Sequence, residues 1–429
     1  MKRLISILLS AVLLFGLTAC SRTGDLTGVS GVAAPVYPKG IAFEDFDARR
    51  ELRDLNPVND NTVNAVNQFS YNTAAQILTE SGTNACYSPL SLYYALALAA
   101  VGAEGPTQEE LLVLLGAGDI TQLSEQCGNL YRVLYTDNEI SKLKIANSLW
   151  LDNEVDGQKV SFRDSFTENA AANFYASLFT ADFADVSAGK AMGKWVSDNT
   201  DGTLSPEFQT DAQQLMSILN TVYFYDQWID RFDASKTEED TFYPEDGEES
   251  VCDFMNRTYV SHGFSKGDGY IRSSLSLKAN GSMVFILPDE GVSVADLLSS
   301  PQKLEEIFTQ GEGKNGKVIW SVPKFGYGSS FDLIDTLKGL GVTSAFSLES
   351  ADFSGITDAP AFISGVKQET HISIDENGVE ASAFTKIDYA GSAMPEDQAE
   401  MILNRPFIYG ITAGNGTLLF VGVCMNPLA

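Results

Sequence analysis

The 429-residue chain has only two histidines, His262 and His371. A Ser-His-Asp system or a Cys-His pair would need one of them beside a nucleophile. His371 lies in the strand-like run HISID, where a lone histidine is usually a satisfied polar group, and His262, in SHGF, is expected in a turn. Neither HExxH nor a glycine-rich phosphate loop is present, and no carboxylate spacing selects an acid/base pair. These absences argue against an enzyme, so no catalytic residue, metal site or cofactor is expected.

Basic residues and cysteines are also scarce. The 28 Lys and Arg stand against 57 Asp and Glu, which gives a formal net charge of −29. Such a surface repels polyanions, so the charge argues against nucleic acid and anionic lipid as partners. The five cysteines are widely spaced and form no CxxC pair, which leaves metal and redox motifs without support. A Cys86–Cys424 bridge is conceivable in an oxidising compartment, but buried free thiols are favoured.

Only one long apolar run occurs, and it lies at the start of the chain. Lys2 and Arg3 precede residues 4–17, which are apolar but too few to span a bilayer comfortably. This pattern is typical of a signal peptide over residues 1–19. The LTAC sequence that ends at Cys20 resembles a bacterial lipobox, in which Cys20 is lipidated after cleavage; an ordinary secretory signal with a chance cysteine is the alternative. A lipidated chain would be anchored in the cell envelope, at the surface or in the periplasm, and would touch the membrane through the lipid alone.

The next part of the chain lacks a clear pattern. Residues 21–40 are mainly Gly, Ser, Thr, Ala and Pro without periodicity, which is typical of a tether. Residues 41–59 are rich in charge and could pack as an extra N-terminal piece, which the sequence does not place. We therefore expect a lipidated N-terminus and tether over residues 20–60 and one globular domain over residues 61–429, a length that suits one large domain.

Periodicity predicts several elements of this domain. Residues 64–78 are expected to form a helix, because apolar side chains recur there on one stripe. Ser88 and Pro89 suit the first turn of a second helix, which is apolar almost all round and therefore buried on most sides. Residues 238–249 carry many carboxylates and are expected to form a solvated edge.

The most unusual stretch is residues 372–404. From residue 379 to 389 the side chains alternate with period two. One face carries small or apolar residues: Val379, Ala381, Ala383, Thr385, Ile387 and Tyr389. The other face is mostly polar and is interrupted only by Phe384. Gly378 precedes the run and AGSAMPED follows it, which is typical of a loop. A strand pattern inside a loop indicates a segment that can be inserted into a sheet.

The motif DENGVEASA at residues 375–383 resembles the hinge of the reactive loop in serpins, the serine-protease-inhibitor family. The motifs NRPF at 404–407, LFVG at 419–422 and Asn-Pro at 426–427 are similar to the end of that family's chain. Each motif alone is weak, but their ordered combination over residues 64–427 is specific. The resemblance implies an α+β serpin fold with about nine helices around three β-sheets and an exposed reactive-centre loop.

The resemblance also implies roles for individual residues. The hinge would comprise Glu376, Gly378, Val379, Glu380, Ala381, Ser382, Ala383 and Thr385. The shutter and breach, where the main sheet parts and the loop first enters, would comprise Ser88, Ser91, Asn220, Trp228 and Gln368. Read alone, Asn220 and Trp228 are more often ordinary structural residues. Many serpins have a histidine where this chain has Gln368. Because glutamine donates and accepts, the hydrogen-bond network can persist without its pH dependence.

These features predict an inhibitory serpin, a monomer that acts as a suicide substrate of serine proteases. The protease would cleave the loop, whose N-terminal part would then enter the main sheet as a new strand. The family's spacing from Gly378 places the reactive bond at Ser392–Ala393, which favours elastase-like enzymes, as would cleavage at Ala393–Met394. A bond at Tyr389–Ala390 would instead suit chymotrypsin-like enzymes.

The alternative is a non-inhibitory serpin that acts as a binding or carrier protein. Such members often carry a charged or bulky residue where insertion begins. None of the inward residues of the alternating run is charged, and the bulky Phe384 should point outward. We also expect Val379, the first inward residue, to lie near the surface of the intact protein.

Overall fold

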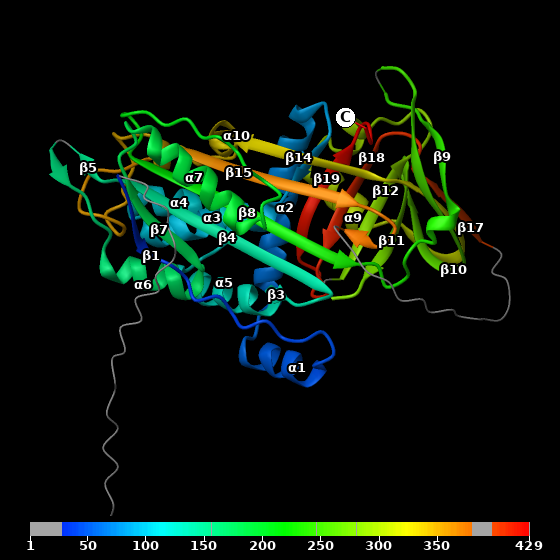
Figure 1. Ribbon diagram of the computed structural model, residues 1–429, viewed down its shortest axis with the longest axis horizontal. Helices are drawn as coiled ribbons and strands as arrows, with labels where there is room; N and C mark the ends of the chain where they lie inside the picture. The colour runs from blue at the N-terminus through cyan, green and yellow to red at the C-terminus, as the bar shows by residue number, and fades with distance from the viewer. Residues whose placement is uncertain (1–27, 156, 246, 280, 380–396, 429) are drawn as a thin grey trace, which may run out of the picture.

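The computed structural model describes residues 28–155, 157–245, 247–279, 281–379 and 397–428 (Figure 1). Within these residues the chain forms ten α-helices, two large sheets and a two-stranded ribbon. The helices are α1 (Phe46–Leu55), α2 (Asp60–Ser81), α3 (Pro89–Gly102), α4 (Gly105–Leu115), α5 (Ile120–Leu134), α6 (Asp164–Asn173), α7 (Val186–Asn199), α8 (Val294–Leu297), α9 (Pro301–Thr309) and α10 (Ile334–Gly339). This architecture confirms the α+β fold that the sequence predicts.

The main sheet has eight strands in the order β1-β7-β4-β8-β16-β15-β14, with β3 paired to β4. Its strands are β1 (Val29–Ala33), β3 (Thr136–Asp137), β4 (Ser141–Asp152), β7 (Ala176–Ala181), β8 (Met216–Gln227), β14 (Phe325–Asp332), β15 (Ile363–Ile374) and β16 (Gly378–Val379). β8 and β15 pair directly and in parallel from Ile363 to Glu369, and the short β16 lies between them near the other end. We call the line along which β8 and β15 meet the seam.

The second sheet has nine strands in the order β17-β13-β10-β11-β12-β18-β19-β2, with β9 paired to β10. Its strands are β2 (Ala85–Tyr87), β9 (Thr237–Phe242), β10 (Ser250–Gly267), β11 (Tyr270–Leu277), β12 (Gly281–Pro288), β13 (Glu312–Pro323), β17 (Gln398–Ile402), β18 (Phe407–Thr412) and β19 (Leu418–Cys424). The ribbon joins β5 (Glu154–Val155) to β6 (Gln158–Lys159). The three acidic residues Glu238, Glu239 and Asp240 of β9 are exposed, as expected of the carboxylate-rich stretch. His262 lies within β10 and not in a turn, because β10 continues past an irregularity between Tyr259 and His262.

The core lies on both faces of the main sheet. The larger cluster joins α2, α3 and α5 to the inner faces of both sheets. α3 is buried along nearly its whole length, as its all-round apolar sequence predicts. A smaller cluster lies on the opposite face, where Trp195 and Met192 of α7 pack with Trp150 and Leu219 of the sheet. α7 therefore covers the outer face of β4 and β8, as Figure 1 shows.

The N-terminal segment is packed where the composition indicates a tether. Val29–Ala33 form β1, which pairs antiparallel with the edge strand β7. Further on, the ring of Tyr37 stacks on Tyr135 and Tyr175 at centroid distances of 6.1 and 6.3 Å. α1 follows and has no buried residue. No helix among the described residues is long and apolar enough to cross a membrane.

Candidate functional site

The hinge is already part of the main sheet at Gly378 and Val379, which form β16. Val379 pairs with Asp226 of β8 and with Ile374 of β15, and its side chain is only 2% exposed. The expectation that Val379 lies near the surface is therefore wrong. The short β16 fills the gap between two strands, so neighbours cover it on both sides and its side chain joins the larger core cluster.

Gly378 makes this close approach to β8 feasible. A Cβ atom at residue 378 would lie 2.2 Å from the carbonyl oxygen of Asp226 and 2.7 Å from Cα of Gln227. Backbone atoms cannot move aside as a side chain can. Any larger residue would therefore push β16 away from β8, which explains a glycine at this hinge position.

Trp228 holds the turn that leads into β16. Its indole Nε1 donates to the carbonyl of Asp375 at 3.0 Å, and its backbone N–H donates to the carbonyl of Asn377 at 3.0 Å. The backbone N–H of Phe232 donates to the carbonyl of Glu376 at 3.0 Å. The indole is 1% exposed. The structure thus brings Trp228 to the hinge, at the breach position that the resemblance implies.

Glu376 fixes the same turn through its carboxylate. Thr237 donates a hydrogen bond to it at 2.8 Å, and the Lys324 ammonium lies 3.4 Å away. Partial burial raises the pKa of Glu376, but its own backbone N–H, Thr237 and Lys324 outweigh burial and hold the pKa below its ordinary value. The turn is therefore tied to the second sheet by a charged group that is ionised at neutral pH.

The shutter residues meet where α3 begins below the seam. Gln368 accepts from the backbone N–H of Ser88 at 3.0 Å and donates to the Ser88 carbonyl at 2.9 Å. It also donates to Oδ1 of Asn220 at 3.3 Å across the seam. Asn220 in turn donates to the Ser91 carbonyl at 2.9 Å, and the Ser91 hydroxyl donates back to Asn220. We call Asn220 and Gln368 the shutter pair.

Asn147 of β4 is a member of this network that the sequence analysis missed. Its Oδ1 accepts from Nδ2 of Asn220 at 2.6 Å, and it is fully buried. The signal in the sequence is an amide inside the apolar strand IANSLWL, because a buried amide needs partners from other elements. The shutter therefore links three strands of the main sheet, β4, β8 and β15, to the start of α3.

The loop that follows β16 lies outside the described residues. This applies to the hinge residues Glu380, Ala381, Ser382, Ala383 and Thr385, to the predicted bond Ser392–Ala393, and to Cys20. The chain returns at Asp397, whose carbonyl accepts from the backbone N–H of Lys317 at 2.9 Å. β17 then pairs in parallel with β13. The two ends of the loop are thus fastened to different sheets.

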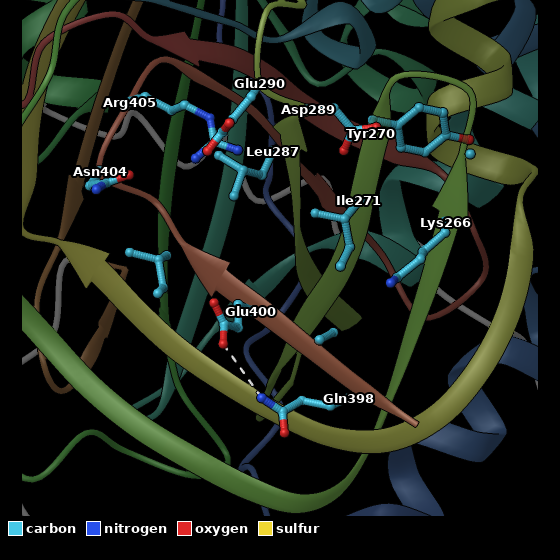
Figure 2. Close-up of a pocket in the computed structure, with 13 residues that line it drawn as sticks. Lys266, Tyr270, Ile271, Leu287, Asp289, Glu290, Gln398, Glu400, Asn404 and Arg405 are labelled. Atoms are coloured by element: carbon cyan, nitrogen blue, oxygen red, sulfur yellow. Dashed lines mark hydrogen bonds between the residues drawn. The ribbon is translucent and has the colours of Figure 1, made fainter. Parts of the chain in front are cut away.

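A polar groove of about 760 Å³ borders the outer edge of β17. Figure 2 shows Glu400 and Gln398 on one side and Lys266 and Tyr270 on the other. At one end of the groove, Nε and Nη2 of Arg405 donate hydrogen bonds to the carbonyl of Pro288, at 3.2 and 2.8 Å. Because both carboxylates and cations line it, the groove favours no single class of charged ligand.

The remaining candidate chemical groups are dispersed. Cys86, Cys127, Cys252 and Cys424 are free and buried, as favoured above. Within the described ranges, no three His, Cys, Asp or Glu side chains stand close enough together to hold a metal ion. The ring of His262 stacks on Tyr259, and its Nε2 lies 2.9 Å from the Ser274 carbonyl. His262 therefore occupies a structural position in the second sheet.

The site is a main sheet that holds the start of a loop between two strands and closes the rest of its seam with a buried polar network. A family model described as "Serpin (serine protease inhibitor)" matches residues 64–427. The chain belongs to the serpin family.

The relatives support this assignment over nearly the whole chain. Serpin-ZX of Arabidopsis thaliana is 29% identical over 395 residues, covering 86% of this chain and 98% of its own length. The thermophilic serpin tengpin in its native state has a TM-score of 0.75 at 27% identity, covering 93% of this chain and 100% of that one. Human thyroxine-binding globulin complexed with its ligand has a TM-score of 0.73 at 24% identity, with coverages of 86% and 98%, and shows likeness of fold alone.

Proposed function

We propose that this serpin inhibits elastase-like serine proteases as a suicide substrate. The protease would cleave the loop and become acylated, and the cleaved strand would enter the main sheet and distort the enzyme. The observation that carries the proposal is the position of β16. Both of its residues pair with β8, and Val379 also pairs with Ile374 of β15, so the chain enters the loop from inside the sheet.

The register supports insertion in one defined alignment. Val379 pairs with Asp226 and Ile374 at once. In an antiparallel ladder each residue forward on the loop corresponds to one residue backward on both neighbours. Thr385 would therefore reach both members of the shutter pair, which are partners of each other in the intact sheet. The two strands thus predict the same alignment, and a new strand would fit between them without a register shift.

The same alignment buries the small face of the loop. Ala381 would lie between Phe224 and Ile372, and Ala383 between Val222 and Thr370, all of which are buried. Insertion would add on the order of ten ladder hydrogen bonds at roughly 1 kcal/mol each. It would also bury apolar side chains at roughly 1–2 kcal/mol each. These gains exceed the loss of the parallel pairing across the seam, so the inserted state is favoured.

The residues around the expected bond support the elastase-like preference. Ser392 and Ala393 are small and suit a shallow specificity pocket. No Lys or Arg lies between Lys386 and Arg405, so a trypsin-like enzyme has no suitable side chain there. Cleavage at Tyr389–Ala390 by a chymotrypsin-like enzyme is the alternative within the same mechanism.

A carrier function is the second candidate, because the fold is shared with thyroxine-binding globulin, whose structure contains its ligand. The hinge favours inhibition over this alternative. The inward residues beyond β16, Ala381, Ala383 and Thr385, are small and uncharged, and only insertion would place them between β8 and β15.

We further propose that the protein is exported and anchored in the cell envelope through a lipid on Cys20. The support is the signal-peptide pattern and the LTAC sequence. Replacement Cys20→Ala should release the protein from the membrane fraction or leave it unprocessed. An unchanged detergent partition of this variant would remove the lipid anchor from the proposal.

The inhibitory mechanism is tested by incubating residues 28–429 with elastase, chymotrypsin and trypsin. We expect an SDS-resistant complex with elastase, whose released peptide begins at Ala393 or Met394. Cleavage of the loop without any complex would favour the carrier function. A peptide that begins at Glu396 or beyond would overturn the bond assignment alone.

A further inference from the structure

Two cationic side chains meet at one neutral oxygen at the end of β8, beside the hinge. Arg231 Nη2 donates to Oε1 of Gln227 at 2.6 Å, and Lys278 Nζ donates to the same oxygen at 3.0 Å. The amide of Gln227 is held in this orientation because its Nε2 donates to the Tyr225 hydroxyl at 3.2 Å. A single uncharged acceptor thus serves two positive charges.

The neighbouring carboxylates leave this pair with an excess of positive charge. Asp226 is fully buried, and its oxygens accept the backbone N–H groups of Gln227 at 2.8 Å and Ala279 at 3.2 Å. Asp230 pairs with Arg257 at 3.6 Å. Within the part of the chain that the structure describes, neither Arg231 nor Lys278 makes an ion pair. Such an excess is unusual on a chain with a net charge of −29.

The guanidinium of Arg231 also has more N–H donors than the surrounding residues offer acceptors. Its Nε and Nη1 are buried and have no hydrogen-bond partner among the described residues. A buried donor without a hydrogen-bond partner destabilises the folded state. Burial first, and then the charge of Arg231, lower the pKa of Lys278, while Asp226 opposes this shift. A negative oxygen in front of the two cations would oppose the lowering of the Lys278 pKa, and a group with several oxygens would offer Arg231 further acceptors.

We propose that Arg231 and Lys278 form a binding site for a small oxyanion, meaning a carboxylate, sulfate or phosphate group. The planar guanidinium offers paired N–H donors to such a group, and the ammonium supplies a second charge. Both side chains are partly exposed, so the ligand approaches from solvent and replaces Oε1 of Gln227 as the shared acceptor. Gln227 is the β8 partner of Gly378, so the site borders the hinge. The proposal does not depend on the inhibitory function.

The first test measures the melting temperature of the full chain with increasing inorganic phosphate, sulfate or acetate, against sodium chloride at matched ionic strength. A ligand that binds only the folded state raises the Tm in a saturable manner. We expect a rise of about 1–3 °C above the chloride control. A rise in Tm with phosphate and sulfate alone would show that the site accepts tetrahedral oxyanions. A rise with acetate as well would show that it also accepts carboxylates. A Tm that follows ionic strength alone overturns the site.

Two variants assign the effect to these side chains. Arg231→Gln and Lys278→Gln should each remove the saturable rise, because each leaves a single cation. Lys194→Gln is the matched control, since this lysine lies on α7 and pairs with Asp198 at 2.6 Å. It should retain the wild-type response. Equal responses from all three variants would show that the anion binds elsewhere. If Arg231→Gln does not fold, Lys278→Gln alone decides the assignment.

A third variant supplies the missing charge from within the chain. Gln227→Glu places a carboxylate oxygen at the point where both cations already converge. In this variant, the two negative charges at residues 226 and 227 balance the two positive charges of Arg231 and Lys278. The variant should melt at a higher temperature than the wild type and should no longer respond to phosphate or sulfate. A lower Tm with an intact phosphate response would overturn the proposal.

Discussion

Asn220 of β8 and Gln368 of β15 are partners in the backbone ladder across the seam, and their side-chain amides are hydrogen-bonded at 3.3 Å. The same two residues reach the start of α3, where Gln368 contacts the backbone of Ser88 and Asn220 contacts Ser91. The seam is therefore closed by polar contacts that a new strand would have to displace. Each such contact contributes only about 1 kcal/mol to stability.

Replacement Asn220→Ala should destabilise the intact protein. It leaves donors and acceptors of Gln368, Ser91 and Asn147 without a partner in a buried site, at about 1–3 kcal/mol. Chemical denaturation measures this loss, and we expect an unchanged m value. Asn129→Ala provides a control at a buried amide away from the seam. If Asn220→Ala unfolds at the wild-type denaturant concentration, the network does not stabilise the intact sheet.

Replacement Gln368→His should make stability depend on pH. A buried histidine has a folded-state pKa below its unfolded value of about 6.5, because burial disfavours the charged form. Its contribution is present above the unfolded pKa and is lost as the pH falls through the folded pKa. Burial also lowers the pKa of His262 and His371, so the wild type has a weaker dependence of the same sign. The difference in Tm between variant and wild type should therefore grow from pH 7 to pH 5, and a constant difference would contradict this.

The main helices could be predicted from local patterns in the sequence, and most of the shutter could be predicted from the family resemblance. Ser88 and Pro89 mark the start of α3, and the all-round apolar run predicts its burial. The assignment of Asn220 and Gln368 to the shutter rests on the resemblance to serpins. The contacts between them confirm that these positions come together.

Other features depend on distant contacts and could not be predicted. β1 is short and made of small residues, and it exists because the edge of β7 offers it a partner. His262 has turn-like neighbours, yet pairing with β13 keeps it in a strand. The burial of Val379 requires that Gly378 approach the backbone of β8 closely, a tertiary relationship with no local signal.

Replacement Glu376→Gln should reduce stability at neutral pH but not at low pH. The pKa of Glu376 is lowered in the folded state, so its stabilising contribution is present above the unfolded pKa of about 4.3 and is lost as the pH falls below it. The variant should therefore melt below the wild type at pH 7, by the loss of about 1 kcal/mol, and close to it at pH 3.5. An equal gap at both pH values would show that the carboxylate charge is not responsible.

Replacement Val379→Arg tests the mechanism at the first inward residue of the loop. Because Val379 is already buried between β8 and β15, the arginine would place an unpaired guanidinium in the core, at a cost of several kcal/mol. The intact variant should relieve this cost by releasing β16 from the sheet, with a lower Tm and faster proteolysis near residue 378. Its loop should still be cleaved at the same bond, but insertion should be too slow to trap the enzyme, so the variant becomes a substrate. Glu380→Arg, on the opposite face of the alternating run, should remain an inhibitor. Equal amounts of SDS-resistant complex from wild type and Val379→Arg would show that strand insertion does not carry the inhibition.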